Sequence, residues 1–245
     1  SSRINLHSLY SQNRQGWFPW IFEQCQISPG LRILELGCGD GTLWTDNLSL
    51  LPEDISITLS DISSGMLRDA RRAIGSSDTR FAFRAFDCRK IPCKDESFDL
   101  VIANHVLFYC DDIPSVLKEV RRVLAPGGRF LCSAYGKAHM QEVSQLVQDF
   151  DERIVLSADR LYERFGRENG QSILEPFFPK AHWLSYEDCL LVQDAEPLIS
   201  YVLSCHGNQN QYLLDHFAEF RSFVKKKTDA GFSVTKDAGV FCCTK

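Results

Sequence analysis

The stretch that most constrains this chain is an apolar run that leads directly into three alternating glycines, Gly37, Gly39 and Gly41. Residues 31–36 predict a central strand of a parallel sheet, because they are almost continuously apolar. The glycines lack a β-carbon, so the backbone can turn sharply there and approach a ligand closely. Thr42 then opens a predicted helix, whose first N–H groups favour an anion. Since ligands of open α/β sheets bind at the carboxyl ends of the strands, this turn predicts a ligand site.

The spacing of the glycines distinguishes this turn from that of the common dinucleotide sites. Nicotinamide and flavin sites use Gly-x-Gly-x-x-Gly, whereas this chain has Gly-x-Gly-x-Gly, preceded by Glu35. Three glycines by themselves also occur in ordinary turns between a strand and a helix. The function of the turn therefore has to be inferred from the residues that follow it in register.

Two acids follow the next two predicted strands. The strand 56–60 ends at Asp61, roughly 20 residues beyond the glycine turn, where α/β nucleotide sites place a carboxylate on the ribose hydroxyls. The strand 81–85 leads into Asp87. Each acid also has a simpler interpretation, because Asp61 could cap the helix predicted at 64–74 and Asp87 could form a turn.

A fourth predicted strand, 96–103, ends at the polar pair Asn104 and His105. An imidazole titrates near neutrality, so His105 could act as a base towards an acceptor, or it could simply pack and hydrogen-bond locally. The Pro-Gly-Gly turn at 126–128 leads into a fifth strand, 129–134. Strands that alternate with helices in this way predict the α/β class.

The order and spacing of these motifs resemble those of the class I S-adenosylmethionine-dependent methyltransferases of the small-molecule type. The motifs that carry the resemblance are Glu35 with its three glycines, Asp61, Asp87, Asn104 and the Pro-Gly-Gly turn. The resemblance covers residues 28–136 closely and 180–245 weakly. It implies an α/β fold with a doubly wound, mostly parallel, seven-stranded Rossmann-like sheet, an antiparallel last strand and a helical cap insertion.

The resemblance also implies that S-adenosylmethionine is the cofactor, and it assigns binding residues. In similar enzymes the acid after the second strand holds the ribose, and the acid after the third accepts the adenine amino group. An arginine or tyrosine before the first strand meets the cofactor's carboxylate. The cofactor-binding residues implied here are Tyr10, Arg14, Glu35, Gly37, Gly39, Asp61, Ile62, Met66, Asp87, Cys88 and Asn104. Met66 also fits the buried face of a helix, and His105 is the catalytic candidate.

Four functional ranges are expected. They are an N-terminal helical lid (1–28), a cofactor-binding core (29–136), a helical cap or substrate insertion (137–180) and a C-terminal completion of the sheet (181–245). The aromatic residues of the first range could instead pack over an edge of the sheet. The third range could equally consist of surface helices without a ligand role.

Composition limits the class of partner. A length of 245 residues with 44% hydrophobic residues suits one large α/β domain, or one domain with an elaboration. A net charge of −5 does not favour nucleic acid, and the Asn-Pro-Pro-Tyr-like motif of base methyltransferases is missing. No apolar run approaches the roughly 20 residues that span a membrane, and no signal-peptide pattern is seen. The ten cysteines include no C-x-x-C pair, which predicts free thiols in a reducing cytoplasm and no metal site.

The sequence therefore predicts an enzyme that transfers a methyl group from S-adenosylmethionine to a small-molecule acceptor and releases S-adenosylhomocysteine. Two alternatives stay open at this point. One is a non-catalytic module that binds the same cofactor, and the other is a nicotinamide-dependent dehydrogenase. The acceptor, the atom methylated and the oligomeric state are not predicted.

Overall fold

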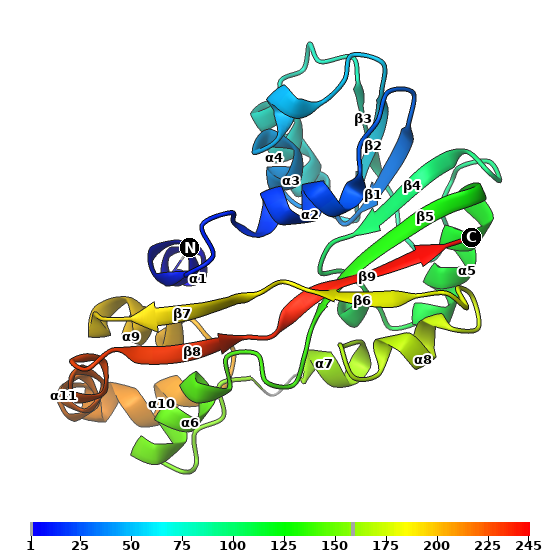
Figure 1. The fold of residues 1–245 in the computed structure, drawn as a ribbon. Coiled ribbons are helices and arrows are strands. Elements are labelled where there is room, and N and C mark those ends of the chain that lie inside the picture. Colours follow the sequence, from blue (N-terminus) through cyan, green and yellow to red (C-terminus); the bar gives the residue numbers. More distant parts are fainter. Residues whose placement is uncertain (1, 158–159) are drawn as a thin grey trace. The chain divides into compact units, whose positions relative to one another are not determined.

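The computed structural model describes residues 2–157 and 160–245 (Figure 1), and the chain divides into two compact units. The core unit comprises residues 15–135, 161–186 and 238–245. The second unit comprises residues 1–14, 136–160 and 187–237. Each unit has its own sheet and its own hydrophobic core.

The core unit is built on a seven-stranded sheet with the strand order β3-β2-β1-β4-β5-β9-β6. The strands are β1 (Arg32–Leu36), β2 (Ser56–Asp61), β3 (Phe81–Ala85), β4 (Phe98–Ala103), β5 (Leu124–Tyr135), β6 (His182–Ser185) and β9 (Ala238–Thr244). The first five pair in parallel, and β9 runs antiparallel to both β5 and β6. The predicted fold class, a mostly parallel seven-stranded Rossmann-like sheet with an antiparallel last strand, is confirmed.

Helices cover both faces of this sheet because successive side chains of its buried strands point to opposite faces. Ile33 of β1 packs with α2 (Trp17–Cys25), α3 (Thr42–Thr45) and α4 (Ser64–Ile74). Its neighbour Leu34 packs with the other face, which is covered by α5 (Ile113–Val123), α7 (Leu161–Arg164) and α8 (Gly170–Leu174). A separate hydrophobic cluster therefore packs against each face of the sheet.

The register of the parallel strands brings the predicted motifs to one edge. Leu36 at the end of β1 lies opposite Ser60 of β2 and Ala103 of β4. The residues that follow these three positions are Gly37, Asp61 and Asn104. The glycine turn, the first acid and the polar pair therefore emerge side by side at the carboxyl ends of adjacent strands.

The described part of the second unit combines five α-helices with a two-stranded antiparallel sheet. The elements are α1 (Ser2–Tyr10), α6 (Gln141–Phe150), α9 (Ala195–Leu203), α10 (Gln209–Leu213), α11 (Phe217–Thr228), β7 (Asp188–Val192) and β8 (Phe232–Lys236). Its core contains Leu190 and Val234, which lie opposite each other in β7 and β8, together with Leu198 and Phe220. The unit therefore has an apolar core that is distinct from those of the large sheet.

The two units cut across the predicted functional ranges. Residues 1–28 form two separate helices, α1 in the second unit and α2 in the core unit. Of the range 181–245, only β6 and β9 join the large sheet, because β7 and β8 pair with each other instead. Among the described residues, no helix is long and apolar enough to cross a lipid bilayer.

Candidate cofactor site

The glycine turn after β1 depends on glycine for two reasons. Gly37 has a φ of 64°, and a β-carbon built on it would lie 2.5 Å from Cγ2 of Val106. Gly41 has a φ of 81°, and its β-carbon would lie 3.1 Å from Cβ of Ala70 in α4. Any side chain at these two positions would be costly, because the backbone is left-handed and a neighbouring side chain lies close.

The Asp61 carboxylate joins the glycine turn to the start of α4. Its Oδ2 accepts a hydrogen bond from the N–H of Gly39 at 3.0 Å, and its Oδ1 accepts from the N–H of Ser63 at 2.8 Å. The cap of α4 is Ser63, whose hydroxyl accepts from the N–H of Met66, so Asp61 is not the capping residue. A carboxylate has about four acceptor positions, so Asp61 can still receive two ligand hydroxyls.

Glu35 links the strand before the glycine turn to the helix after it. Its side chain is 2% exposed, and Oε2 accepts a hydrogen bond from Nε1 of Trp44 in α3 at 2.6 Å. Burial raises the pKa of Glu35 to about 7, and the nearby charges of Asp61 and Asp40 act in the same direction. The acid that precedes the glycines therefore anchors the helix that follows them.

A pocket of about 400 Å³ opens at this edge of the core unit. Six of the residues predicted from the sequence line it: Gly37, Asp61, Ile62, Asp87, Cys88 and His105. Ile62 is 78% exposed, so most of its side chain is accessible to a ligand in the pocket. Met66 is 45% exposed, so the alternative that it is a core residue is wrong. Exposed apolar side chains beside two carboxylates suit a ligand with a flat ring and hydroxyl groups.

Asp87 is both a turn former and a pocket residue. Its carboxylate accepts from the backbone N–H of Arg89 at 2.9 Å and forms an ion pair with the guanidinium of Arg89 at 2.6 Å. These hydrogen bonds lower the pKa of Asp87, so the group is ionised at neutral pH. Three N–H groups of Arg89, on its backbone N, Nε and Nη2, donate to this carboxylate. A carboxylate has about four acceptor positions, so one is left for a ligand and the two interpretations of this acid are compatible.

Asn104 and His105 are held by the neighbouring strand β5 and by α2. Oδ1 of Asn104 accepts hydrogen bonds from Oγ of Ser133 at 2.7 Å and from Nε1 of Trp17 at 3.2 Å. The His105 ring is stacked between Trp17 and Tyr135, with centroid distances of 4.9 and 4.4 Å. Both faces of the imidazole are covered, so a catalytic role would have to use its edge.

Other residues of the site were missed by sequence reasoning. Trp17 was predicted only as lid or packing residue, although it positions Asn104 and His105. Tyr109, Cys110 and Asp111 line the pocket after the 3-10 turn at Leu107–Tyr109. No local pattern marks them, because their place depends on where the chain returns after β4.

Tyr10 and Arg14 belong to the second unit, and Glu35, Gly39, Met66 and Asn104 do not line the pocket directly. The roles that the sequence resemblance implies for these residues stay predictions. Gly39 is nevertheless hydrogen-bonded to the pocket residue Asp61, and Glu35 is hydrogen-bonded to the buried Trp44 of α3.

Taken together, the core unit is a Rossmann-like domain whose ligand pocket lies at the carboxyl edge of a parallel sheet. A family model described as "Methyltransferase domain" matches residues 34–132, which include the glycine turn, Asp61, Asp87 and Asn104. Residues 34–132 are thus similar to a methyltransferase domain.

Two curated relatives each match less than half of this chain. A sterol 4-C-methyltransferase of Caenorhabditis elegans is 32% identical over 111 residues, which is 45% of this chain and 33% of that protein. A demethylmenaquinone methyltransferase of Symbiobacterium thermophilum is 33% identical over 121 residues, 47% of this chain and 48% of that protein. The chain therefore spans at most about half the length of these two curated relatives.

A phosphoethanolamine N-methyltransferase of Haemonchus contortus, solved with S-adenosylhomocysteine, superimposes with a TM-score of 0.57 at 18% identity. The superposition covers 94% of this chain and 53% of that structure. At this identity the likeness concerns the fold alone.

Proposed function

We propose that this chain transfers a methyl group from S-adenosylmethionine to a small-molecule acceptor and releases S-adenosylhomocysteine. The observation that carries the proposal is the pocket at the sheet edge, where two carboxylates, Asp61 and Asp87, flank an exposed apolar side chain, Ile62. This donor and acceptor set fits an adenosine, which offers two ribose hydroxyls, one amino group and a flat ring. The match to the methyltransferase domain supports the same choice of cofactor.

We assign the parts of the cofactor to residues as follows. Asp61 accepts the ribose hydroxyls, and Ile62 packs against the adenine ring. Asp87 accepts the adenine amino group, and the N–H of Cys88 donates to the ring. Gly37 lets the methionine portion approach the backbone. These assignments rest on pocket lining and on the sequence resemblance.

A second group of residues is proposed to support the site without contacting the adenosine. Glu35 holds α3 through Trp44, and Gly39 fixes the carboxylate of Asp61. Met66 lies in α4, and Asn104 directly follows β4 and precedes the pocket residue His105. The assignment of Tyr10 and Arg14 to the cofactor's carboxylate rests on the resemblance alone.

When bound, the cofactor supplies a methyl group on a sulfonium, so the protein's part is to bind and align. Alignment of two bound reactants can account for about 7–11 kcal/mol of the barrier. We propose His105 as a base for acceptors that must lose a proton, a contribution of roughly 10²–10⁴-fold. Trp17 and Tyr135 fix its ring plane, which favours a defined direction of proton transfer along the ring edge.

The acceptor is proposed as a small molecule because the named relatives methylate a sterol and demethylmenaquinone, and because the chain is acidic overall. We also propose a cytoplasmic setting, since all ten cysteines are free thiols, as a reducing compartment maintains.

Calorimetric titration with S-adenosylmethionine and S-adenosylhomocysteine tests the proposal. We expect micromolar binding, and a loss of about 10–100-fold in Asp61→Ala from removal of charge-assisted hydrogen bonds. A thermal melt of the variant controls for folding, because Asp61 also holds Gly39 and Ser63. Thermal stabilisation by NAD, but not by S-adenosylmethionine or S-adenosylhomocysteine, would instead support the dehydrogenase. Tight binding without methyl transfer to any acceptor class would support a non-catalytic module.

A further inference from the structure

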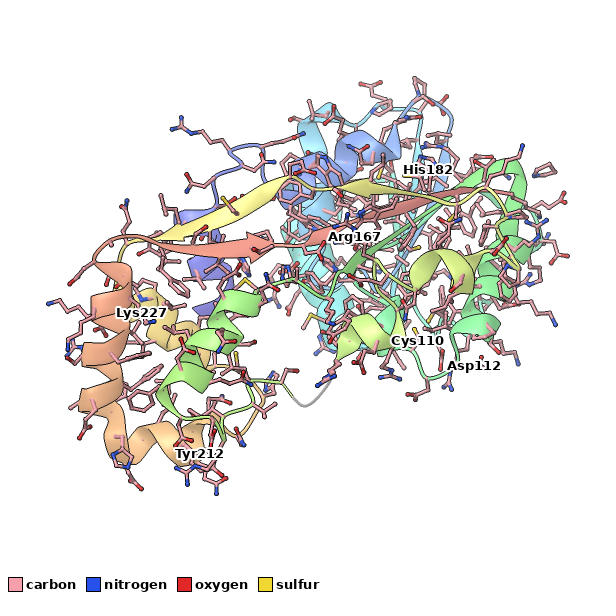
Figure 2. All side chains as sticks on the ribbon, turned by 60° about the horizontal axis from the view of Figure 1, so that its bottom comes forward. Cys110, Asp112, Arg167, His182, Tyr212 and Lys227 are labelled. Carbon is pink, nitrogen blue, oxygen red and sulfur yellow. The ribbon has the colours of Figure 1, made fainter. Side chains whose placement is uncertain are left out.

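Two thiols face each other in the lining of the pocket. Sγ of Cys88 and Sγ of Cys110 lie 3.7 Å apart, and both residues are partly exposed. Cys88 follows β3, whereas Cys110, labelled in Figure 2, follows the 3-10 turn at Leu107–Tyr109. Both side chains line the pocket, so a small solute that enters it reaches them.

The surroundings favour a thiolate at Cys110. The hydrogen bond from the Cys88 thiol lowers the pKa of Cys110, and the positive charges of Arg164 and Arg89 act in the same direction. Burial and the charge of Asp87 oppose this effect. Arg164 is held in place, because its Nη2 donates to the carbonyl of Cys110 at 3.3 Å and to Asp111 at 3.0 Å. A thiolate beside arginines and in contact with solvent is the reactive form of cysteine.

We propose that Cys88 and Cys110 are a reversible oxidation site, in which a peroxide converts the two thiols into a disulfide across the pocket lining. The Cys110 thiolate attacks one peroxide oxygen, the O–O bond breaks, and the leaving oxygen takes up a proton. The resulting sulfenic acid on Cys110 is then attacked by the sulfur of Cys88. The S–S bond forms, the S–O bond breaks and a second water leaves. Two thiols and one hydrogen peroxide thus give one disulfide and two waters, with two electrons passing from sulfur to the peroxide.

The disulfide would change the pocket where the adenine is proposed to bind, and this part rests on the proposed function. The sulfurs must approach from 3.7 Å to about 2.05 Å, which draws the segment after β3 towards the end of the 3-10 turn. Cys88 directly follows Asp87, so the shift displaces both proposed adenine contacts. We expect the oxidised protein to bind S-adenosylhomocysteine about tenfold more weakly, the equivalent of one lost hydrogen bond.

Peptide mapping tests the modification itself. The whole chain is reduced, freed of reductant, treated with hydrogen peroxide and digested without reduction. We expect a linked peptide pair containing Cys88 and Cys110, lost on treatment with a dithiol and absent from Cys88→Ser and Cys110→Ser. Cys93→Ser is the matched control, because Cys93 is also partly exposed and is hydrogen-bonded by Arg84 instead. Oxidation that leaves these two residues unlinked would overturn the proposal.

Titration with S-adenosylhomocysteine tests the consequence separately. Each protein is compared with itself before and after peroxide, so any direct effect of a substitution cancels. We expect the tenfold loss in the unsubstituted protein and in Cys93→Ser, but not in Cys110→Ser. Equal affinity of the reduced and the linked protein would overturn the effect on the pocket. If the reduced protein binds no S-adenosylhomocysteine, the proposed function fails, and the peptide map still decides whether the thiols pair.

Discussion

Asp61 accepts a hydrogen bond from the N–H of Gly39 at 3.0 Å, so the acid of the second strand fixes the turn after the first. Its other oxygen holds the N–H of Ser63 at the start of α4. The two motifs that the sequence presents about 20 residues apart are thereby one structural element. A ligand that binds Asp61 also meets a turn whose conformation that acid has already set.

The first prediction concerns two glycines of the same turn. Gly37 and Gly39 both have positive φ. A β-carbon on Gly37 would overlap Val106, whereas a β-carbon on Gly39 would have no atom within 4 Å. We expect Gly37→Ala to lower the free energy of unfolding by roughly 2–5 kcal/mol, through backbone strain and overpacking. Gly39→Ala, the control, should lose about 1–2 kcal/mol from strain alone.

Urea unfolding measures both variants. The double variant Gly37→Ala with Val106→Ala should recover part of the loss, because it removes the overlapping methyl group. Equal destabilisation by the two single glycine variants would contradict the role given to Val106.

The second prediction concerns the pH dependence of the core unit. Burial raises the pKa of Glu35 to about 7, whereas an unfolded glutamate titrates near 4.3. Between these values the folded state binds more protons, so stability must fall as the pH rises through this window. The loss amounts to about 4 kcal/mol and is complete by about pH 8. Glu35→Gln can still accept from Trp44 and should abolish this loss.

Tryptophan fluorescence during unfolding at about pH 5 and about pH 8 checks this. All four tryptophans, Trp17, Trp20, Trp44 and Trp183, belong to the core unit, so the signal reports that unit. If the variant and the unsubstituted protein lose stability equally between the two pH values, Glu35 is not the responsible group.

The third prediction has the opposite sign and concerns the second unit. Burial lowers the pKa of His7 to about 4, and Lys236, whose Nζ lies 3.2 Å from Nδ1, acts in the same direction. Asp188 opposes the shift, and the ring centroids of His139 and Tyr201 lie 6.5 and 6.3 Å from that of His7. An unfolded histidine titrates near 6.5, so the unfolded chain binds more protons between about pH 4 and 6.5.

Stability contributed by neutral His7 is therefore present above about pH 6.5 and falls by about 3 kcal/mol as the pH falls towards 4. Hydrogen exchange of α1, followed by mass spectrometry, measures it locally. The exchange protection of α1 should fall on acidification in the unsubstituted protein and much less in His7→Gln. Acid-induced loss of the same size in both would exclude His7 as its origin.

The fourth prediction tests the adenine contact of Asp87. A carboxylate accepts from the adenine amino group, but it meets a carbonyl oxygen in the inosine analogue of S-adenosylhomocysteine. We expect the unsubstituted protein to prefer the adenosine compound by about 10–100-fold, through one charge-assisted hydrogen bond and the repulsion it replaces. Asp87→Ala should bind both compounds with similar affinity. Arg89→Ala is the control, since it removes the ion pair but keeps the carboxylate, and it should retain the preference.

The fold of the core unit could be predicted because its signals are local. The strands β1 to β4 are short, largely apolar runs bounded by turns, and α4 begins and ends at the predicted residues 64 and 74. The strand β5 begins earlier than predicted, at Leu124, and includes the Pro-Gly-Gly segment that was predicted as a turn. The second unit was not foreseen as a separate body. Its strands β7 and β8 pair across the intervening residues 193–231, and short apolar runs do not identify their partners.

Site residues could be predicted where a residue of a characteristic type closely follows the end of a strand. Asp61, Asp87 and Gly37 met that condition and line the pocket. The role of Glu35 could not be predicted in this way, because its hydrogen-bond partner is the indole of Trp44 on the next helix. The contact between Cys88 and Cys110 likewise arises from tertiary structure, since 22 residues separate them.

The hydrogen bonds around Asn104 run in one direction. The N–H of His105 donates to Oγ of Ser133, and that hydroxyl donates to Oδ1 of Asn104. An indole N–H can only donate, so the bond from Trp17 independently identifies the same atom as oxygen. Both lone pairs of that oxygen are then occupied, and the amide can offer only its NH₂ hydrogens to anything else. A ligand group that contacts the Asn104 side chain must therefore be a hydrogen-bond acceptor. This requirement is set by Ser133 and Trp17, which lie outside the pocket lining.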